Sequence, residues 1–220
     1  MAGNGVWRCH RPLPLGIWVP PGKRAANGSC PEARRFLFDE RRLSPGVVSW
    51  LGISSTASPI PASSHPHCQW FNAPSLLIPY RHADGTLQSL QARYLGEDGE
   101  KPRFQFPQGS RCSMFNLPML GQLQAGDRLF ISEGVTDCMA LLSSGRKAIA
   151  IPSATLLRQE DVETVDKACG SQVELHMVPD RDEPGERLYL QLKQALPRLV
   201  RHQLPEGYKD FGQWWAAHAP

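Results

Sequence analysis

The chain of 220 residues lacks several features that would place it in common classes of protein. No apolar stretch approaches the roughly 18 residues of a membrane-spanning helix, so we expect no membrane partner. Prolines interrupt the N-terminus before an apolar core can form, which argues against a secretory signal. No G-x-x-x-x-G-K-[ST] motif occurs, so Walker-type nucleotide hydrolysis is not supported. With 41% hydrophobic and 20% charged residues, the composition predicts one good-sized globular domain or two small ones.

Closely spaced cysteines are also lacking, since none of the six forms a C-x-x-C pair: Cys9, Cys30, Cys68, Cys112, Cys138 and Cys169. Structural zinc needs four ligands, usually in paired short spacings. No such spacing joins the available candidates, so we expect no zinc: Cys9, His10, Cys30, His65, His67 and Cys68. We interpret the cysteines as reduced and the protein as cytoplasmic. Cys138 lies in an apolar segment and is expected to be a small buried residue.

The net charge of +3 is distributed unevenly along the chain. Residues 1–125 carry 13 Lys and Arg against 7 Asp and Glu, whereas residues 126–220 carry 11 against 14. A basic first half beside a more acidic second half suits a polyanion that passes a metal site. Ordinary solvated surface charge would give the same small excess, so this pattern alone decides nothing.

Acidic residues stand at the ends of two expected strands in the second half. The apolar runs Leu129–Ile131 and Val173–Val178 are typical of buried parallel strands; the first is followed by Glu133, the second by Asp180 and Asp182. Lys147 to Ile151 is a plausible strand between them. Because ligands bind at the carboxyl ends of parallel strands, we expect one acidic cluster there.

Such a cluster suits a divalent metal, because Mg²⁺ prefers oxygen ligands together with substrate phosphates. Asp137 lies one helical turn after Glu133 and supports the same site. Gly134 and Gly185 lack a Cβ, which permits tight turns and close approach of a ligand. For any one acid alone, capping of a helix N-terminus is the simpler interpretation. Three acids at matching strand ends favour the metal site.

The segments E-G-V-T-D (133–137) and P-D-R-D-E-P-G (179–185) together resemble the Toprim domain. DnaG-type primases, topoisomerases and some nucleases share this domain, whose signature is Glu-Gly after the first strand and D-x-D-x-x-G after the third. The resemblance implies an α/β fold with a central, mainly parallel sheet flanked by helices. It also implies that Glu133, Asp180 and Asp182 are catalytic metal ligands for Mg²⁺ or Mn²⁺, with two ions bound.

The first half resembles the N-terminal subdomain of DnaG-type primases. Phe36–Leu43 and the segment from Ser44-Pro45 predict two short helices, although Arg42 stands where that family has glycine. Ser54–Ser64 is expected to be a linker, and Leu76–Tyr80 with Leu87–Leu95 a β-hairpin. Arg93 and Arg103 correspond to basic residues that contact template or nucleotide phosphates. With Arg93 and Arg103, three further residues form a basic strip in the sequence: Arg81, Lys101 and Arg111.

The end of the chain predicts a helix at 186–196 with a buried stripe that includes Leu188, Leu192 and Ala195, then a last edge strand at Leu199-Val200. Lys209 and Asp210 resemble part of a K-D-x-N-E segment that closes many Toprim primases, although the Asn is missing. They are expected either to assist phosphate or metal binding or to cap the next helix. We expect an irregular segment at 1–30, a basic α+β subdomain at 31–125 and a Toprim catalytic domain at 126–220.

The resemblance implies a DNA primase core that makes RNA primers from ribonucleoside triphosphates on single-stranded DNA, with a replicative helicase as a candidate partner. No zinc ribbon or helicase region is recognisable, which is typical of a phage or mobile-element variant whose other modules lie on separate chains. Metal-dependent nuclease activity and a non-catalytic single-strand-binding role stay open as alternatives. A topoisomerase is disfavoured, because no region for a nucleophilic Tyr is evident.

Overall fold

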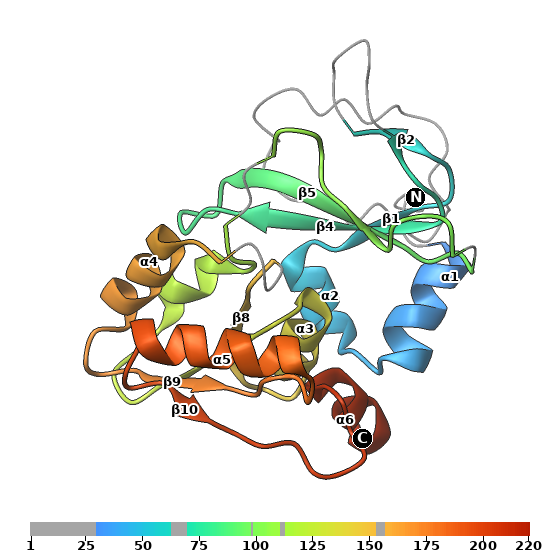
Figure 1. Ribbon diagram of the computed structural model, residues 1–220. Helices are drawn as coiled ribbons and strands as arrows, with labels where there is room; N and C mark the ends of the chain where they lie inside the picture. Colours follow the sequence, from blue (N-terminus) through green and yellow to red (C-terminus); the bar gives the residue numbers. More distant parts are fainter. Residues whose placement is uncertain (1–29, 63–69, 98, 111–112, 153–156) are drawn as a thin grey trace.

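The computed structural model describes residues 30–62, 70–97, 99–110, 113–152 and 157–220. Nearly all of the predicted irregular segment 1–30, and Arg111 of the basic strip, therefore lie outside the described residues. Two sheets of four strands dominate the fold, one antiparallel and one parallel (Figure 1). No helix in the described ranges is long and apolar enough to cross a membrane.

The second half of the chain forms the parallel sheet, with strand order β10-β9-β7-β8. Its strands are β7 (Arg128–Ser132), β8 (Lys147–Ala150), β9 (Glu174–Met177) and β10 (Val200–Arg201). The intervening helices are α3 (Val135–Ser143), α4 (Gln159–Cys169) and α5 (Glu183–Ala195), followed by α6 (Phe211–His218). Crossovers between parallel strands are almost always right-handed, and with this strand order that rule places α3 on one face of the sheet and α4 and α5 on the other. The predicted fold class, a mainly parallel sheet flanked by helices, is confirmed.

The apolar strand residues predicted the buried layer of this sheet correctly. Leu129, Ile131 and Leu175 are fully buried, because strands covered on both faces need apolar residues on both. Cys138 is fully buried within α3, as expected. In α5, Leu188 and Leu192 are buried, but Ala195 is exposed near the helix end, so the predicted stripe was wrong at that position.

The first half forms the antiparallel sheet, with strand order β1-β4-β5-β6. Its strands are β1 (Ser54–Thr56), β4 (Ser75–Arg81), β5 (Leu87–Tyr94) and β6 (Phe104–Gln105), beside a two-stranded sheet of β2 (Ile60–Pro61) and β3 (Trp70–Phe71). The predicted hairpin is confirmed as β4 and β5. The predicted linker at Ser54–Ser64 was wrong in part, because its start pairs with the edge of β4 as β1 and it also contains β2.

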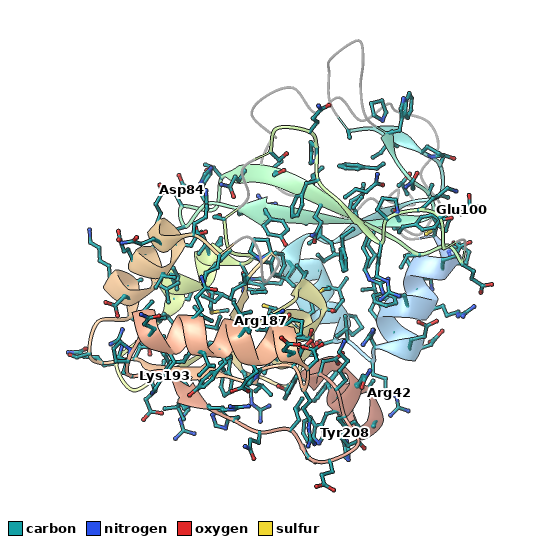
Figure 2. All side chains as sticks on the ribbon, viewed as in Figure 1. Arg42, Asp84, Glu100, Arg187, Lys193 and Tyr208 are labelled. Atoms are coloured by element: carbon teal, nitrogen blue, oxygen red, sulfur yellow. The ribbon has the colours of Figure 1, made fainter. Side chains whose placement is uncertain are left out.

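A short helical segment precedes this sheet and consists of α1 (Pro31–Arg34) and the π-helical η1 (Arg35–Glu40), followed by α2 (Pro45–Leu51). Arg42 links η1 to α2 at φ +49°, a left-handed conformation that favours glycine. Its guanidinium donates to the carbonyl of Ala219 at 3.1 Å, and its carbonyl accepts from Trp215 Nε1 at 3.1 Å. Figure 2 shows Arg42 close to the C-terminal helix. Contacts with α6 therefore accompany the strained backbone.

One hydrophobic core joins the two sheets, since Phe36 and Ile78 belong to the same buried cluster as Ile131 and Ile149. A bridge between Phe115 and Ala150 also connects the segment before the 3₁₀ helix η2 (Leu117–Gln122) to the edge of β8. The division of the chain at residue 125 stays a prediction. Whatever its boundary, the two halves are packed so that residues from both approach the carboxyl ends of β7 and β9.

Candidate active site

The predicted acidic residues meet at the carboxyl ends of β7 and β9. These strands are parallel neighbours with Ile131 opposite Met177, so Glu133 and Asp180 leave the sheet at the same edge. Burial raises the pKa of Asp180 to about 8, and repulsion from neighbouring carboxylates adds to the effect: Asp137, Glu133, Asp210 and Asp182. The structure therefore brings these acids close together, and the sequence candidate Asp210 joins them from the N-cap of α6.

Asp137 joins this cluster to α6. The carboxyl group is only 8% exposed, and its Oδ1 accepts a hydrogen bond from the Gly212 backbone N–H at 2.8 Å. Burial, followed by repulsion from Asp210, raises the pKa of Asp137 to about 7, while Arg41 acts in the opposite direction. A Cβ on Gly212 would lie 3.0 Å from Asp137 Oδ1, so a glycine there allows α6 to pack close to the acid.

Glu133 carries an unsatisfied atom. Its Oε2 is buried and has no hydrogen-bond partner, although buried carboxylate oxygens are usually paired. Burial, and then repulsion from Asp182, raises the pKa of Glu133. The side chain therefore has an oxygen available for an external donor or cation.

Asp182 and Asp210 both cap helices at the rim of the cluster. Asp182 Oδ1 accepts from the Gly185 N–H at 2.9 Å, and Asp210 Oδ1 accepts from the Gln213 N–H at 2.7 Å. The hydrogen bond from Gly185, assisted by Lys209, lowers the pKa of Asp182. Lys209 Nζ lies 3.0 Å from Asp182 Oδ2, and this contact raises the pKa of Lys209. The capping interpretation of Asp210 is thus correct, and the same carboxylate also repels Asp137 and Asp180.

Gly185 is required by close backbone packing. A Cβ at this position would lie 2.5 Å from the carbonyl oxygen of Asp180, a distance that no side chain tolerates without movement of the loop. Gly134 is less crowded, since its Cβ would lie 3.3 Å from Asp137 Oδ2. The two predicted glycines therefore differ in kind: one fixes the loop of Asp180, and the other borders Asp137.

The donor set fits a hard divalent cation, which prefers oxygen ligands and accepts the unpartnered oxygen of Glu133. Within the described residues, however, no three acidic, His or Cys side chains already surround a single point as ligands would. The reason lies in their present partners, because Asp182 contacts Lys209 and Gly185 while Asp137 contacts Gly212. Chelation by the predicted trio would require Asp182 to exchange Lys209 for the ion.

A buried arginine, Arg93, and a half-buried one, Arg41, lie together, and Arg41 reaches the acids. Arg93 is only 8% exposed, its Nε has no hydrogen-bond partner, and its guanidinium carbon lies 3.7 Å from the centroid of the Phe36 ring. Burial, followed by repulsion from Arg41 and Arg103, lowers the pKa of Arg93 to about 10. Arg41 stacks on the same ring at 5.5 Å and has a nitrogen 3.3 Å from the position of a Gly212 Cβ. Arg41 thus lies between Arg93 and Asp137.

The sequence did not assign a functional position to Arg41 or Phe36. Both were expected on an amphipathic helix, and no spacing rule connects that helix with β5. The available signal was two pairs of arginines, Arg34-Arg35 and Arg41-Arg42, whose positions relative to β5 cannot be deduced from spacing alone. Packing of η1 against Arg93 provides the missing information.

The rest of the predicted basic strip is spread over the first sheet. Arg93 pairs with Leu76 at one end of β4, whereas Arg81 stands at the other end and donates to the carbonyl of Gly85 at 3.1 Å. Lys101 Nζ lies 3.4 Å from the Tyr94 hydroxyl and 5.1 Å from the centre of its ring. The structure therefore brings Arg103 into the electrostatic neighbourhood of Arg93, while Arg81 lies several strand residues away.

The sequence matches no protein-family model and no curated protein. Solved structures with a similar fold include three primase domains. The first is a DnaG primase catalytic domain bound to single-stranded DNA, at 17% identity and TM-score 0.63, covering 86% of this chain and 71% of that one. The second is a DNA primase domain from Pseudomonas aeruginosa, at 17% identity and TM-score 0.64, covering 84% and 67%. The third is the RNA polymerase domain of Mycobacterium tuberculosis primase DnaG, at 19% identity and TM-score 0.64, covering 82% and 70%. The chain thus has the fold of a DnaG primase catalytic core.

Proposed function

We propose that this chain is a Toprim-type DNA primase core that synthesises RNA primers on single-stranded DNA. The observation that carries the proposal is that a cluster of buried acids and a buried arginine lie near each other without forming an ion pair. Glu133 and Asp180 form part of a buried acidic cluster with raised pKa values, and the unpaired Arg93 lies near it through Arg41. Nucleotide polymerisation needs both, because cations balance the acids and arginines balance the phosphates.

Glu133, Asp180 and Asp182 would hold Mg²⁺ or Mn²⁺, with Asp137 in support. Two such ions, when bound, supply activation of the primer 3′-hydroxyl and stabilisation of the leaving pyrophosphate. Gly185 keeps the Asp180 loop compact, and Gly212 holds Asp137 in place through its backbone N–H. Lys209 occupies the Asp182 carboxylate until an ion replaces it, after which its ammonium group is available to a triphosphate.

Arg41, Arg93 and Arg103 would receive the phosphates of the template or the incoming ribonucleotide. Within the described part of the chain, no ion pair joins Arg41 or Arg93 to a carboxylate, so both retain charge for an external anion. The Phe104 side chain is 41% exposed and lies 5.7 Å from the Arg93 guanidinium, which gives a base a ring on which to stack. The single-stranded DNA bound by a similar primase domain supports this choice of ligand. Arg81 and Lys101 would steer the strand by their charge, a role also proposed for Arg111, which lies outside the described residues.

The context of the enzyme is part of the same proposal. We infer that the enzyme works with a replicative helicase in a phage or mobile-element system. Metal-dependent cleavage of DNA by the same acids is the competing activity, since an oxygen-only cluster serves either reaction.

The test is primer synthesis on mixed-sequence single-stranded DNA with labelled ribonucleotides and Mg²⁺ or Mn²⁺. Asp180→Asn and Glu133→Gln should abolish labelled RNA products. The matched controls Asp166→Asn and Glu163→Gln change acids on the outer surface of α4 and should retain wild-type synthesis. Shortening of the DNA without RNA products would replace the primase proposal with a nuclease. Binding of DNA without any reaction, unchanged in the two site variants, would leave an accessory protein.

A further inference from the structure

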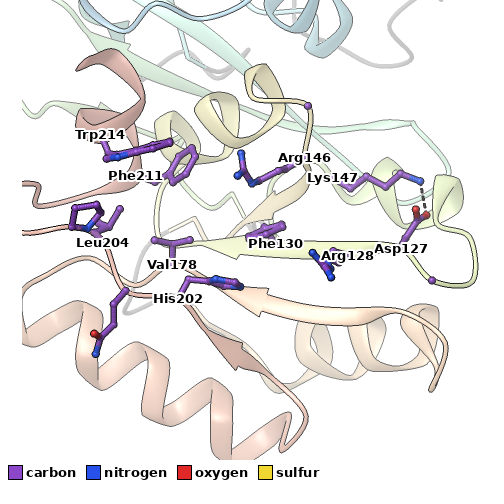
Figure 3. Close-up of a pocket in the computed structure, with 14 residues that line it drawn as sticks. Asp127, Arg128, Phe130, Arg146, Lys147, Val178, His202, Leu204, Phe211 and Trp214 are labelled. Atoms are coloured by element: carbon purple, nitrogen blue, oxygen red, sulfur yellow. Dashed lines mark hydrogen bonds and ion pairs between the residues drawn. The ribbon is translucent and has the colours of Figure 1, made fainter. Parts of the chain in front are cut away.

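A cavity with a volume of about 660 Å³ lies on the face of the parallel sheet next to α3 and α6 (Figure 3). Its walls come from β7, the turn after α3, the segment after β10 and the start of α6. The residues that line it include Phe130, Arg146, His202, Phe211 and Trp214. The volume is within the range of roughly 300–1,000 Å³ that is typical of small-molecule sites.

The local structure explains why these side chains gather. Side chains alternate between the two faces along β7. Leu129 and Ile131 point into the core on one face, and Phe130 points to the other face, where it lines the cavity. Gly145, at φ +82°, ends α3 with a left-handed residue, and the chain turns back so that Arg146 reaches the rim. The cavity is therefore formed by regular elements of the fold, with one turn at its edge.

The cavity carries a surplus positive charge. Two of its cations have carboxylate partners, because Lys147 pairs with Asp127 and Arg128 pairs with Glu174. Arg146 donates to Ser144 Oγ at 2.6 Å and lies 5.7 Å from the Phe130 ring and 5.6 Å from the Phe211 ring. No carboxylate pairs with Arg146 among the residues that the structure describes. Its guanidinium is exposed, held between two aromatic rings, and available to an anion.

His202 adds a polar group to the wall. His176 Nε2 lies 3.1 Å from Glu174 Oε2, and the carboxylate requires a proton on this nitrogen. His176 Nδ1 then accepts from His202 Nε2 at 2.7 Å, which leaves His202 Nδ1 as a hydrogen-bond acceptor. Burial and the nearby cationic groups lower the pKa of His202, so the ring is neutral at pH 7. The wall thus offers an acceptor as well as a cation.

We propose that this cavity is a binding site for a nucleoside phosphate, separate from the acidic cluster. The phosphate would pair with Arg146, and the base would lie against Phe130 and Trp214. An exocyclic amino group of the base suits the acceptor on His202. A purely apolar ligand would leave the charge of Arg146 unused, and inorganic phosphate would leave the aromatic wall unused.

The position of Phe211 connects the cavity with the acids. Phe211 lines the cavity, while its neighbours in sequence, Asp210 and Gly212, face Asp137. A ligand against Phe211 would hold the start of α6 in place and with it the hydrogen bond from Gly212 to Asp137. Occupancy of the cavity is therefore expected to be coupled to the geometry of the acidic cluster.

Isothermal titration calorimetry in EDTA tests the site without involving metal at the acids. The probes are AMP, ADP, adenosine and pyrophosphate, titrated into the full chain. We expect ADP and AMP to bind with 1:1 stoichiometry, and adenosine and pyrophosphate each to bind at least tenfold more weakly. Arg146→Gln should weaken ADP binding at least tenfold. Arg198→Gln, which changes an arginine of an outer ion pair with Asp166, is the matched control and should bind as the wild type does.

Two further variants separate this site from the proposed active site. Trp214→Leu should also weaken ADP binding, and it keeps the proposal testable if Arg146→Gln does not fold. Asp180→Asn should lose primer synthesis yet retain ADP binding, so failure of the proposed function is distinguishable from failure of the cavity. The proposal is overturned by absence of ADP binding, by equal binding of pyrophosphate, or by binding lost in Arg93→Gln but kept in Arg146→Gln.

Discussion

Two neighbouring regions of this protein bury ionisable groups of opposite type, acids in one and an arginine in the other, that do not pair with each other. At the carboxyl ends of β7 and β9, Asp180 and Glu133 have raised pKa values and Glu133 Oε2 has no partner. Between η1 and β5, Arg93 has a lowered pKa and an unpaired Nε. In a protein selected only for stability, such groups would form an ion pair or be replaced by apolar residues, because an unpaired buried charge costs folding free energy. Under the proposed function, each region receives a ligand, a cation at the acids and a phosphate at Arg93.

The largest effect is expected from Gly185→Ala, which damages the acidic side alone. The new Cβ would meet the Asp180 carbonyl oxygen at 2.5 Å, so the loop must move and carry Asp180 with it. We expect primer synthesis to fall by at least about 100-fold, because small misplacements of catalytic groups have effects of this size. Overpacking should also lower the free energy of unfolding by roughly 1–3 kcal/mol.

Gly121→Ala is the matched control for this change, since a Cβ there meets nothing within 4 Å. Initial rates of primer synthesis and urea denaturation of both variants check the expectation. Wild-type synthesis by Gly185→Ala would show that the Asp180 loop does not need its present position.

The next largest effect concerns the pH dependence of stability on the acidic side. The folded pKa of Asp180, about 8, lies above the ordinary aspartate value of 3.8, so this group stabilises the folded state most fully at low pH. That contribution is lost as the pH rises from about 4 through 8. Asparagine does not ionise, so Asp180→Asn avoids this loss of stability at high pH. In EDTA the variant should have a free energy of unfolding at pH 9 that is higher than that of the wild type by on the order of 2 kcal/mol, after allowance for solvent screening.

Thermal denaturation at pH 5 and pH 9 measures this difference. The variant should gain melting temperature over the wild type at pH 9 and much less at pH 5. Added Mg²⁺ should narrow the gap at pH 9, because a cation relieves the same repulsion in the wild type. A variant that is less stable than the wild type at pH 9 in EDTA would contradict the raised pKa.

Arg93→Met applies the same reasoning to the basic side. Methionine keeps the packing against Phe36 but removes a buried charge, so the free energy of unfolding should rise by about 1 kcal/mol. Binding to single-stranded DNA should weaken about tenfold, roughly 1.4 kcal/mol, and the slope of log K against log salt concentration should fall by the amount expected for about one phosphate contact.

Lys167→Met, on the exposed surface of α4, is the control and should leave DNA binding unchanged. Loss of stability with unchanged DNA binding would assign Arg93 a structural role.

The sequence predicted the acidic side better than the basic side, for a physical reason. Strand ends are marked locally by apolar runs followed by Gly and Asp, so Glu133, Asp180 and Asp182 could be placed from topology alone. Arg41 and Phe36 reach the site only because η1 packs against β5, a contact that no periodicity encodes. The strand β1 was missed because Ser54–Thr56 has no apolar alternation and forms only by pairing with β4. The cavity lined by Phe130 and Arg146 is likewise assembled from five separate segments.

The smallest effect is expected where the two charges are already balanced, at the ion pair of Lys209 with Asp182. The pair is partly exposed, with side-chain exposures of 56% and 31%, so Lys209→Gln should change the free energy of unfolding only slightly. Its effect on metal use should be larger than its effect on stability. Lys209 competes with a cation for Asp182, and its removal should lower the Mg²⁺ concentration for half-maximal primer synthesis several-fold, even if the maximal rate falls.

Arg187→Gln, which removes an exposed pair with Glu183 on α5, should leave the Mg²⁺ requirement unchanged. A higher Mg²⁺ requirement in Lys209→Gln would mean that Lys209 holds Asp182 in the geometry for metal binding.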